Sequence, residues 1–200
     1  MIEISHITKR FGKKAVLDDF SLDIDDDQIY GLIGYNGVGK TTLLKLMNGI
    51  YRPDSGCVKV DGAVVFENAK MKQNIFLMTE ELFLLQQASI SDMANFYRGY
   101  YPGWDQSVCK DLANLFGLDM QKRIGGFSKG MLRQVGILTA FSSGCKYLFL
   151  DEAFDGLDLG IRLVMRQILK LYVRKKNATV VLTSHNLEEL EECADRFGMI

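Results

Sequence analysis

A glycine-rich turn, GYNGVGKTT at residues 34–42, constrains the fold of this chain more than any other stretch. It follows the apolar run Ile29–Ile33 and precedes a second apolar stretch that begins at Leu43, so it joins a buried strand to a helix. It fits the pattern G-x-x-x-x-G-K-S/T. Glycines let backbone N–H groups approach phosphate oxygens, and the positive end of the following helix faces the same anion. The turn therefore predicts a nucleoside triphosphate site.

The positions of this turn have separate chemical uses. Lys40 can reach the β and γ phosphates of a nucleotide, and the Thr41 hydroxyl can ligate Mg²⁺. Successive backbone N–H groups supply further contacts to the phosphates. We expect nucleotide contacts from Gly34, Asn36, Gly37, Gly39, Lys40, Thr41 and Thr42.

Composition argues against nucleic-acid binding, a membrane span, disulfides and a zinc site. The net charge of −1 over 200 residues gives no basic field that would attract nucleic acid, so no such partner is expected. No apolar run approaches the roughly 18 residues that cross a bilayer, and Met1–Glu3 does not begin a signal peptide, so we expect a cytoplasmic chain. The four cysteines lie far apart without CxxC spacing, which favours reduced thiols over disulfides or a zinc site.

Two parts of the chain differ from a nucleotide-binding core. Apolar and polar residues alternate at Ile2–Ile4 and Phe20–Ile24, and Asp61-Gly62 is a hairpin turn, which predicts an antiparallel β subdomain. Residues from about 81 to 141 have helical spacing and few strand signals, which predicts an inserted helical subdomain. We expect its aromatic group to form its core rather than to stack on bases: Phe96, Tyr97, Tyr100, Tyr101 and Trp104.

The sheet of the core resumes after this insert. Tyr147–Leu150 and Thr179–Leu182 are apolar enough for central strands of a parallel sheet. We therefore predict a single α/β domain with a P-loop NTPase core. Residues 1–80 and 142–200 form the core with its β subdomain, and residues 81–141 form the helical subdomain.

Two carboxylates, Asp151 and Glu152, directly follow the first of these strands. Ligands of open α/β sheets bind at the carboxyl ends of the strands, so both side chains should face the nucleotide. Asp151 suits the coordination shell of Mg²⁺. Glu152 can take a proton from the attacking water or orient it, which makes it a predicted catalytic residue together with Lys40.

Four further motifs occur in a fixed order after the phosphate turn: Phe127–Met131, Leu150–Glu152, Asp155–Asp158 and Thr183–His185. With the phosphate turn, they resemble the ATP-binding subunit of an ABC (ATP-binding cassette) transporter over essentially the whole chain. The resemblance implies Mg²⁺-dependent ATP binding and hydrolysis that powers a separate transmembrane permease. It also implies a location on the cytoplasmic face of the membrane when assembled.

The resemblance implies further site residues. Ser128 and Gly130 would contact ATP held by a partner subunit, so we expect an ATP-sandwich dimer with a second copy or a homologous cassette. A Ser-x-Gly turn at a helix N-terminus can itself bind an anion, although a simple helix cap is the alternative. His185 would contact the γ-phosphate as a third catalytic residue. Phe11 would stack on adenine, unless it belongs to the hairpin core, and Asp158 is placed among the nucleotide-binding residues.

The chain departs from the family pattern at several positions. Glu80 stands where the family has a glutamine that links nucleotide to membrane subunit, and a carboxylate only accepts hydrogen bonds whereas an amide also donates. Glu80 is nevertheless included in the predicted nucleotide site. The other departures are Lys129 and Met131 in the signature segment, Arg133-Gln134 in reversed order, Ala153 and Leu159.

The expected contact with the membrane subunit lies beside Glu80. The apolar cluster Leu82–Leu85, with Met93, Phe96 and Tyr97, would form a groove for a short cytoplasmic helix of the permease. The stretch Tyr101–Asp105 looks most like the exporter-type (ABC-2) branch, whose permeases carry six membrane helices.

Two alternatives to a transporter explain the sequence less well. A soluble ABC ATPase that acts on ribosomes or DNA usually joins two cassettes or inserts coiled coils or zinc modules, and the sequence contains none of these. A P-loop GTPase or small-molecule kinase would not explain Phe127–Met131 or His185. Members of the family normally continue past residue 200 with a further hairpin and helix.

Overall fold

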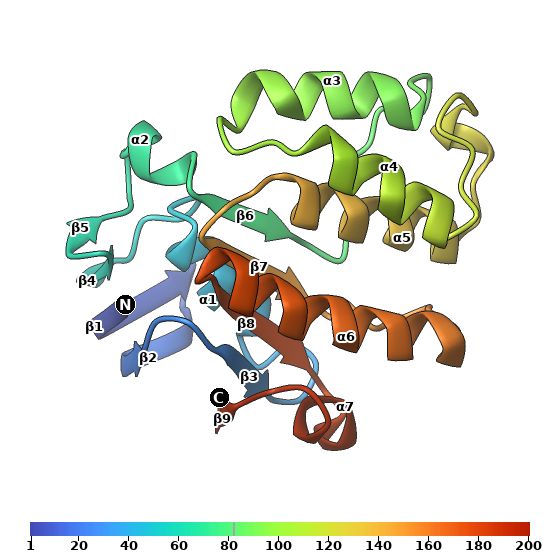
Figure 1. The fold of residues 1–200 in the computed structure, drawn as a ribbon. Helices are drawn as coiled ribbons and strands as arrows, with labels where there is room; N and C mark the ends of the chain where they lie inside the picture. Colours follow the sequence, from blue (N-terminus) through green and yellow to red (C-terminus); the bar gives the residue numbers. More distant parts are fainter. Residues whose placement is uncertain (82) are drawn as a thin grey trace.

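The apolar runs of the sequence form a parallel sheet at the centre of the molecule (Figure 1). The computed structural model describes residues 1–81 and 83–200, and within them this sheet has five strands in the order β6-β7-β8-β3-β9. Every residue of β7 and β8 is buried, as central strands require. The strands are β3 (Ile29–Ile33), β6 (Ile75–Met78), β7 (Tyr147–Asp151), β8 (Thr179–Ser184) and β9 (Arg196–Met199).

Alternate residues of β7 point to opposite faces of this sheet and belong to two separate cores. Tyr147 and Phe149 pack in one core with α1 and the N-terminal strands, whereas Leu148 and Leu150 pack in the other with α5 and α6. Both faces are therefore covered by apolar side chains. The helices outside the insert are α1 (Lys40–Met47), α2 (Ala69–Lys72), α6 (Leu159–Lys176) and α7 (Leu187–Glu191).

The predicted β subdomain is a four-stranded antiparallel sheet with the order β2-β1-β4-β5. Its hairpins turn at Gly12-Lys13 and at Asp61-Gly62. Asp61 and Gly62 both have positive φ, as the tight hairpin turn of two central residues requires. The strands are β1 (Ile2–Phe11), β2 (Lys14–Ile24), β4 (Ser55–Val60) and β5 (Ala63–Val64).

The helical segment contains α3 (Ile90–Tyr100), α4 (Gln106–Leu115), a 3₁₀ turn at Ile124–Gly126 and α5 (Lys129–Ser142), which lie together at the top of Figure 1. Tyr97, Tyr101 and Trp104 pack against its core as expected. The expectation was wrong for Phe96 and Tyr100, which are 53% and 47% exposed. These two residues are four apart on one face of α3, and that face points to solvent.

The edge strand β6 lies outside the strands that the sequence pattern identified. Its four residues are all apolar and do not alternate, so they resemble any short buried segment. They pair in parallel with Tyr147–Leu150 of β7. The strand therefore delivers Thr79 and Glu80 to the same sheet edge as Asp151.

Gly56 and Gly62 offer a matched test of the antiparallel sheet. Both have positive φ (+76° and +72°), which costs an L-residue about 1–2 kcal/mol. A Cβ at Gly56 would also collide with the carbonyl oxygens of Ser5 and His6, whereas at Gly62 nothing lies within 4 Å. We expect Gly62→Ala to lower the free energy of unfolding by about 1 kcal/mol and Gly56→Ala by at least about 2 kcal/mol more. Urea denaturation followed by circular dichroism measures both, and equal losses would contradict the close approach of β1 and β4.

Candidate nucleotide-binding and catalytic site

The phosphate loop, residues 34–42, leads from the end of β3 into the first turn of α1. Gly37 and Gly39 have φ values of +81° and +127°, in the region that favours glycine, so this loop shape depends on them. Lys40 is 5% exposed, and its ammonium donates to the carbonyl oxygens of Gly34 at 2.5 Å and Tyr35 at 3.3 Å. These two bonds hold the Lys40 side chain against the first residues of the phosphate loop.

Asp151 joins the phosphate loop to two central strands. It ends β7 and is only 1% exposed. The Thr41 hydroxyl donates to Oδ2 at 2.6 Å, and the Thr183 hydroxyl of β8 donates to Oδ1 at 2.6 Å. Each carboxylate oxygen therefore has a donor, which compensates for its burial. Thr183 was not among the predicted site residues, because a strand threonine gives no signal until the strand order is known.

Glu152 connects the lysine of the loop to the histidine after β8. Its Oε1 lies 3.0 Å from Lys40 Nζ, an ion pair without hydrogen-bond geometry, and its Oε2 lies 3.0 Å from His185 Nδ1. The backbone N–H of Glu152 donates to the Thr183 hydroxyl at 3.0 Å. Its φ of +46° is left-handed, which is uncommon outside glycine. Among the three predicted catalytic residues, Glu152 therefore contacts both Lys40 and His185.

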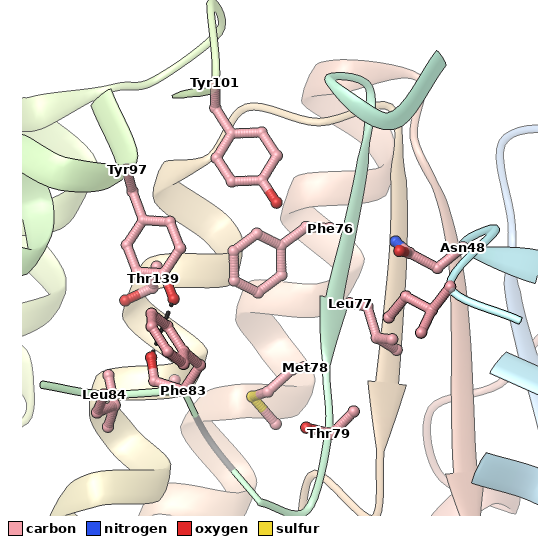
Figure 2. Close-up of a pocket in the computed structure, with 12 residues that line it drawn as sticks. Asn48, Phe76, Leu77, Met78, Thr79, Phe83, Leu84, Tyr97, Tyr101 and Thr139 are labelled. Carbon is pink, nitrogen blue, oxygen red and sulfur yellow. Dashed lines mark hydrogen bonds between the residues drawn. The ribbon is translucent and has the colours of Figure 1, made fainter. Parts of the chain in front are cut away.

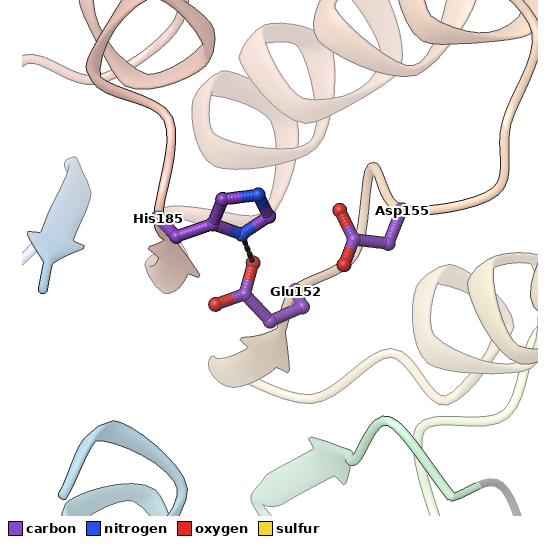
Figure 3. A group of neighbouring side chains, drawn as sticks. All are labelled: Glu152, Asp155 and His185. Atoms are coloured by element: carbon purple, nitrogen blue, oxygen red, sulfur yellow. Dashed lines mark hydrogen bonds and ion pairs between the residues drawn. The ribbon is translucent and has the colours of Figure 1, made fainter. Parts of the chain in front are cut away.

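Asp155 is a neighbour of this group that the sequence analysis did not assign. Figure 3 shows its carboxylate facing Glu152 and His185, and one ligand atom of each residue lies within 4.8 Å of the other two. The Glu152 carboxylate accepts a hydrogen bond from His185 and so raises the pKa of His185 above its ordinary value of 6.5, and the negative charges of Glu152 and Asp155 add to this. The neighbouring carboxylates thereby stabilise the imidazolium form of His185.

A buried polar chain supports the segment that carries His185. Ser184 Oγ donates to Glu189 Oε2 at 2.9 Å, and the 6% exposed Glu189 also pairs with Arg162 at 2.5 Å. Arg162 Nε donates to the Leu157 carbonyl at 3.0 Å. The loop after β7 and the segment after β8 are therefore tied together by α6 and α7. Glu189 and Arg162 were not predicted, because they interact only through the tertiary fold.

A cavity of about 390 Å³ above the phosphate loop brings together most of the predicted nucleotide contacts. Phe11 is 46% exposed at one side of it, with its ring edge-on to Tyr51 at 5.5 Å, so it is not a hairpin core residue. The predicted residues that line this cavity are Phe11, Asn36, Gly37, Gly39, Lys40, Thr41, Thr42, Glu80 and Glu152.

Ser128, Gly130 and Asp158 do not line this cavity. Ser128 caps α5 by accepting the Met131 N–H at 3.3 Å, and Asp158 caps α6 by accepting the Ile161 N–H at 3.0 Å. Within one chain these side chains therefore act as helix caps.

A model of the family described as "ABC transporter" matches residues 17–155. The chain belongs to the ABC transporter family. It is 31% identical over 200 residues to the ABC transporter ATP-binding protein YtrB of Bacillus subtilis (strain 168), covering 100% of this chain and 68% of that one. It is also 31% identical to the lantibiotic transport ATP-binding protein SrtF of Streptococcus pyogenes, covering 100% of this chain and 86% of the relative.

Solved structures agree with this assignment at the level of the fold. The structure of an ATP-binding subunit of an ABC transporter superposes with a TM-score of 0.91 at 23% identity, covering 100% of this chain and 85% of that one. Membership in this ABC family confirms the predicted P-loop fold with its two additions, the ATPase activity and the role in ATP-driven transport. Neither these relatives nor these structures point to a ribosome or DNA role.

The pKa of His185 provides a direct test of the site. We expect Glu152→Gln to lower this pKa toward 6.5, because the carboxylate that stabilises the imidazolium is lost, and Asp155→Asn to lower it less. In the unaltered protein the charged pair persists below the raised pKa and is lost as the pH rises through it. An NMR titration measures the effect, with the other histidine assigned by His6→Gln. An unchanged His185 pKa in Glu152→Gln would mean that the two side chains do not interact in solution.

Proposed function

We propose that this ABC protein binds Mg-ATP in the cavity above its phosphate loop, hydrolyses it between two copies, and drives export through a separate membrane subunit. The contact chain Lys40–Glu152–His185 above the phosphate loop carries this proposal. It places a cation for the phosphates, an acceptor for a proton and a donor for the γ-phosphate within one site.

The cavity has the features that ATP requires. The loop supplies backbone N–H groups and a helix N-terminus for the phosphates, and Lys40 supplies a fixed positive charge. Phe11, supported by the edge of Tyr51, offers an exposed ring face for adenine. Nucleotide binding would replace the lysine contacts to loop carbonyls by charge-assisted contacts to phosphate oxygens.

Thr41 and Asp151 fit a magnesium ion. Both offer oxygen, the ligand atom that Mg²⁺ prefers, and their oxygens lie 2.6 Å apart. Neighbouring ligands of an octahedron with bonds of about 2.1 Å are about 3.0 Å apart, so a small adjustment suffices. When bound, Mg²⁺ would neutralise part of the phosphate charge.

Glu152 and His185 would have different roles in hydrolysis. The buried Glu152 carboxylate is placed to accept a proton from the attacking water, or to orient that water. Its bond to His185 fixes the imidazole, whose other nitrogen can donate to the γ-phosphate. Phosphoryl transfer needs positioning and charge stabilisation more than covalent chemistry, and these groups supply both.

A second copy of the chain would complete the site. Ser128 and Gly130 lie outside the cavity of their own chain, so they are available to the nucleotide of another copy. Ser128 begins α5, whose positive end suits the γ-phosphate of that nucleotide. Two such contacts related by a two-fold axis would enclose two ATP molecules.

Glu152→Gln should separate binding from hydrolysis. We expect this variant to bind ATP and to lose at least about 100-fold in turnover, because the proton acceptor is gone. The γ-phosphate then persists between the two copies, so a Mg-ATP-dependent dimer should accumulate in light scattering. Lys40→Ala is the matched control: its ATP affinity in calorimetry should fall at least about tenfold, and no dimer should form. Full turnover by a strictly monomeric Glu152→Gln protein would contradict both roles.

The proposed contact with the membrane subunit is an apolar groove beside the helical segment. A cavity of about 240 Å³ lies between β6, α3 and α5, and Figure 2 shows aromatic side chains along it. Phe83 is 67% exposed, and its carbonyl accepts from the Tyr97 hydroxyl at 3.2 Å. Phe96 lies next to it, with ring centroids 6.5 Å apart. These exposed rings suit the apolar face of a short helix.

The predicted groove also included Met93 and Leu82. Met93 is only 1% exposed and packs in the core, so its assignment to the groove was wrong. Met93 and Tyr97 are one turn apart on the same face of α3, and at Met93 this face is covered by the core. Leu82 lies outside the described residues.

We propose export as the direction of transport, because the stretch Tyr101–Asp105 resembles the exporter-type branch. Besides the lantibiotic transport protein, the chain is 28% identical to the bacitracin transport ATP-binding protein BcrA of Bacillus licheniformis, covering 100% of this chain and 66% of the relative. Among the described residues, no helix is both long enough and apolar enough to cross a bilayer. In the proposed complex, the permease holds this subunit peripherally on the cytoplasmic face of the membrane, as the family resemblance implies.

Phe83→Asp tests the groove. We expect it to prevent co-purification with the permease, because a buried aspartate without a partner is costly at an apolar interface, while ATP binding by the isolated chain stays within about twofold. Leu115→Asp is the control, since Leu115 is 54% exposed on α4 and does not line the groove. Retained assembly would place the permease elsewhere. Loss of ATP binding would show that Phe83 serves the fold instead.

A further inference from the structure

Arg133 is a buried cation without a counter-ion. It lies in the second turn of α5 and is 7% exposed. One guanidinium nitrogen donates to the carbonyl oxygen of Thr79 at 3.3 Å, and no ion pair in the described part of the chain includes this arginine. The guanidinium nitrogens of Arg133 that have no hydrogen bond are not fully buried, so a carboxylate that reached them could form charge-assisted hydrogen bonds.

A cavity of about 490 Å³ connects Arg133 with Glu80. Both side chains line it, and Glu80 follows directly after the residue that Arg133 contacts. Glu80 also lines the cavity above the phosphate loop. Glu80 thus borders two cavities: the one proposed to bind the phosphates, and the one lined by Arg133, which has no ion pair among the described residues.

We propose that ATP moves the Glu80 carboxylate from the phosphate cavity to Arg133, where the two form an ion pair. This inference rests on the proposed binding of ATP. Negative charge on the triphosphate repels a carboxylate on the same cavity wall, and Arg133 attracts it from the other side. The pair joins the segment after β6 to α5, the helix that starts at the signature residue Ser128. Nucleotide occupancy would thereby shift the surface offered to the second copy.

This pair accounts for two departures of the sequence together. Glutamine at position 80 would carry no charge for the phosphates to repel and would bond an arginine only weakly. An arginine at position 133 without an acidic partner would remain an uncompensated buried charge. Glu81 and Asp155 line the same cavity, but they do not line the phosphate cavity.

A double-mutant cycle on nucleotide affinity tests the proposal. Calorimetry with Mg²⁺ and the non-hydrolysable analogue AMP-PNP gives the dissociation constant of the wild type, Glu80→Gln, Arg133→Gln and the double variant. We expect Arg133→Gln to weaken binding about tenfold, because Glu80 then stays near the phosphates. In the Glu80→Gln background, the same substitution should change affinity less than about twofold. Arg133→Lys keeps the charge and should stay close to wild type.

Control variants distinguish loss of the Glu80–Arg133 ion pair from a general loss of folding or of nucleotide affinity. Arg123→Gln removes an exposed arginine of the helical segment that does not line the cavity, and it should leave affinity unchanged. Arg133→Met keeps an apolar stem of similar length, and it replaces Arg133→Gln if that variant does not fold. Equal losses in both backgrounds, or no loss in either, would overturn the Glu80–Arg133 pair. Absence of binding by the wild type would instead contradict the ATP site itself.

Discussion

A buried carboxylate at the end of the central strand holds the site together. Asp151 would be unstable at 1% exposure without donors, and it receives one hydroxyl from the phosphate loop and one from β8. Because Thr41 lies in the first turn of α1 and Thr183 lies near the end of β8, these two bonds fix the loop against the sheet. The spacing of Lys40, Glu152 and His185 follows from that attachment, since all three lie within two residues of the segments that it joins.

A bound nucleotide would change the interaction partners of several charged side chains around the cavity. Lys40 contacts loop carbonyls and Glu152, and phosphate oxygens offer it stronger partners than the carbonyls do. Glu80 is close to a cation that it does not contact, across a cavity bordered by the helical segment. Electrostatic rearrangement on nucleotide binding would therefore reach both the core and the helical segment without any change in the packing of the sheet.

Local motifs in the sequence predicted most of the site, whereas contacts made through the tertiary fold did not appear in it. The phosphate loop, Asp151 and Glu152 are recognisable because glycine spacing and strand-end carboxylates have a fixed local meaning. Thr183, Asp155 and Glu189 gain their roles from strand order and helix packing, which no single segment encodes. β6 was too short and uniformly apolar to be recognised. Met93 was wrongly assigned because the face of a helix that meets the core depends on its tertiary neighbours.

The left-handed backbone at Glu152 lowers thermal stability at a residue that is proposed to be needed for ATP hydrolysis. A non-glycine residue at φ +46° carries about 1–2 kcal/mol of strain, and a glycine there would remove both the strain and the buried acid. In the proposed mechanism Glu152 is needed for hydrolysis, so a library of variants selected only for survival at high temperature would be enriched in chains that have glycine at this position and no longer turn over ATP. Thermal stability and the proposed chemistry thus favour different residues at this one backbone position.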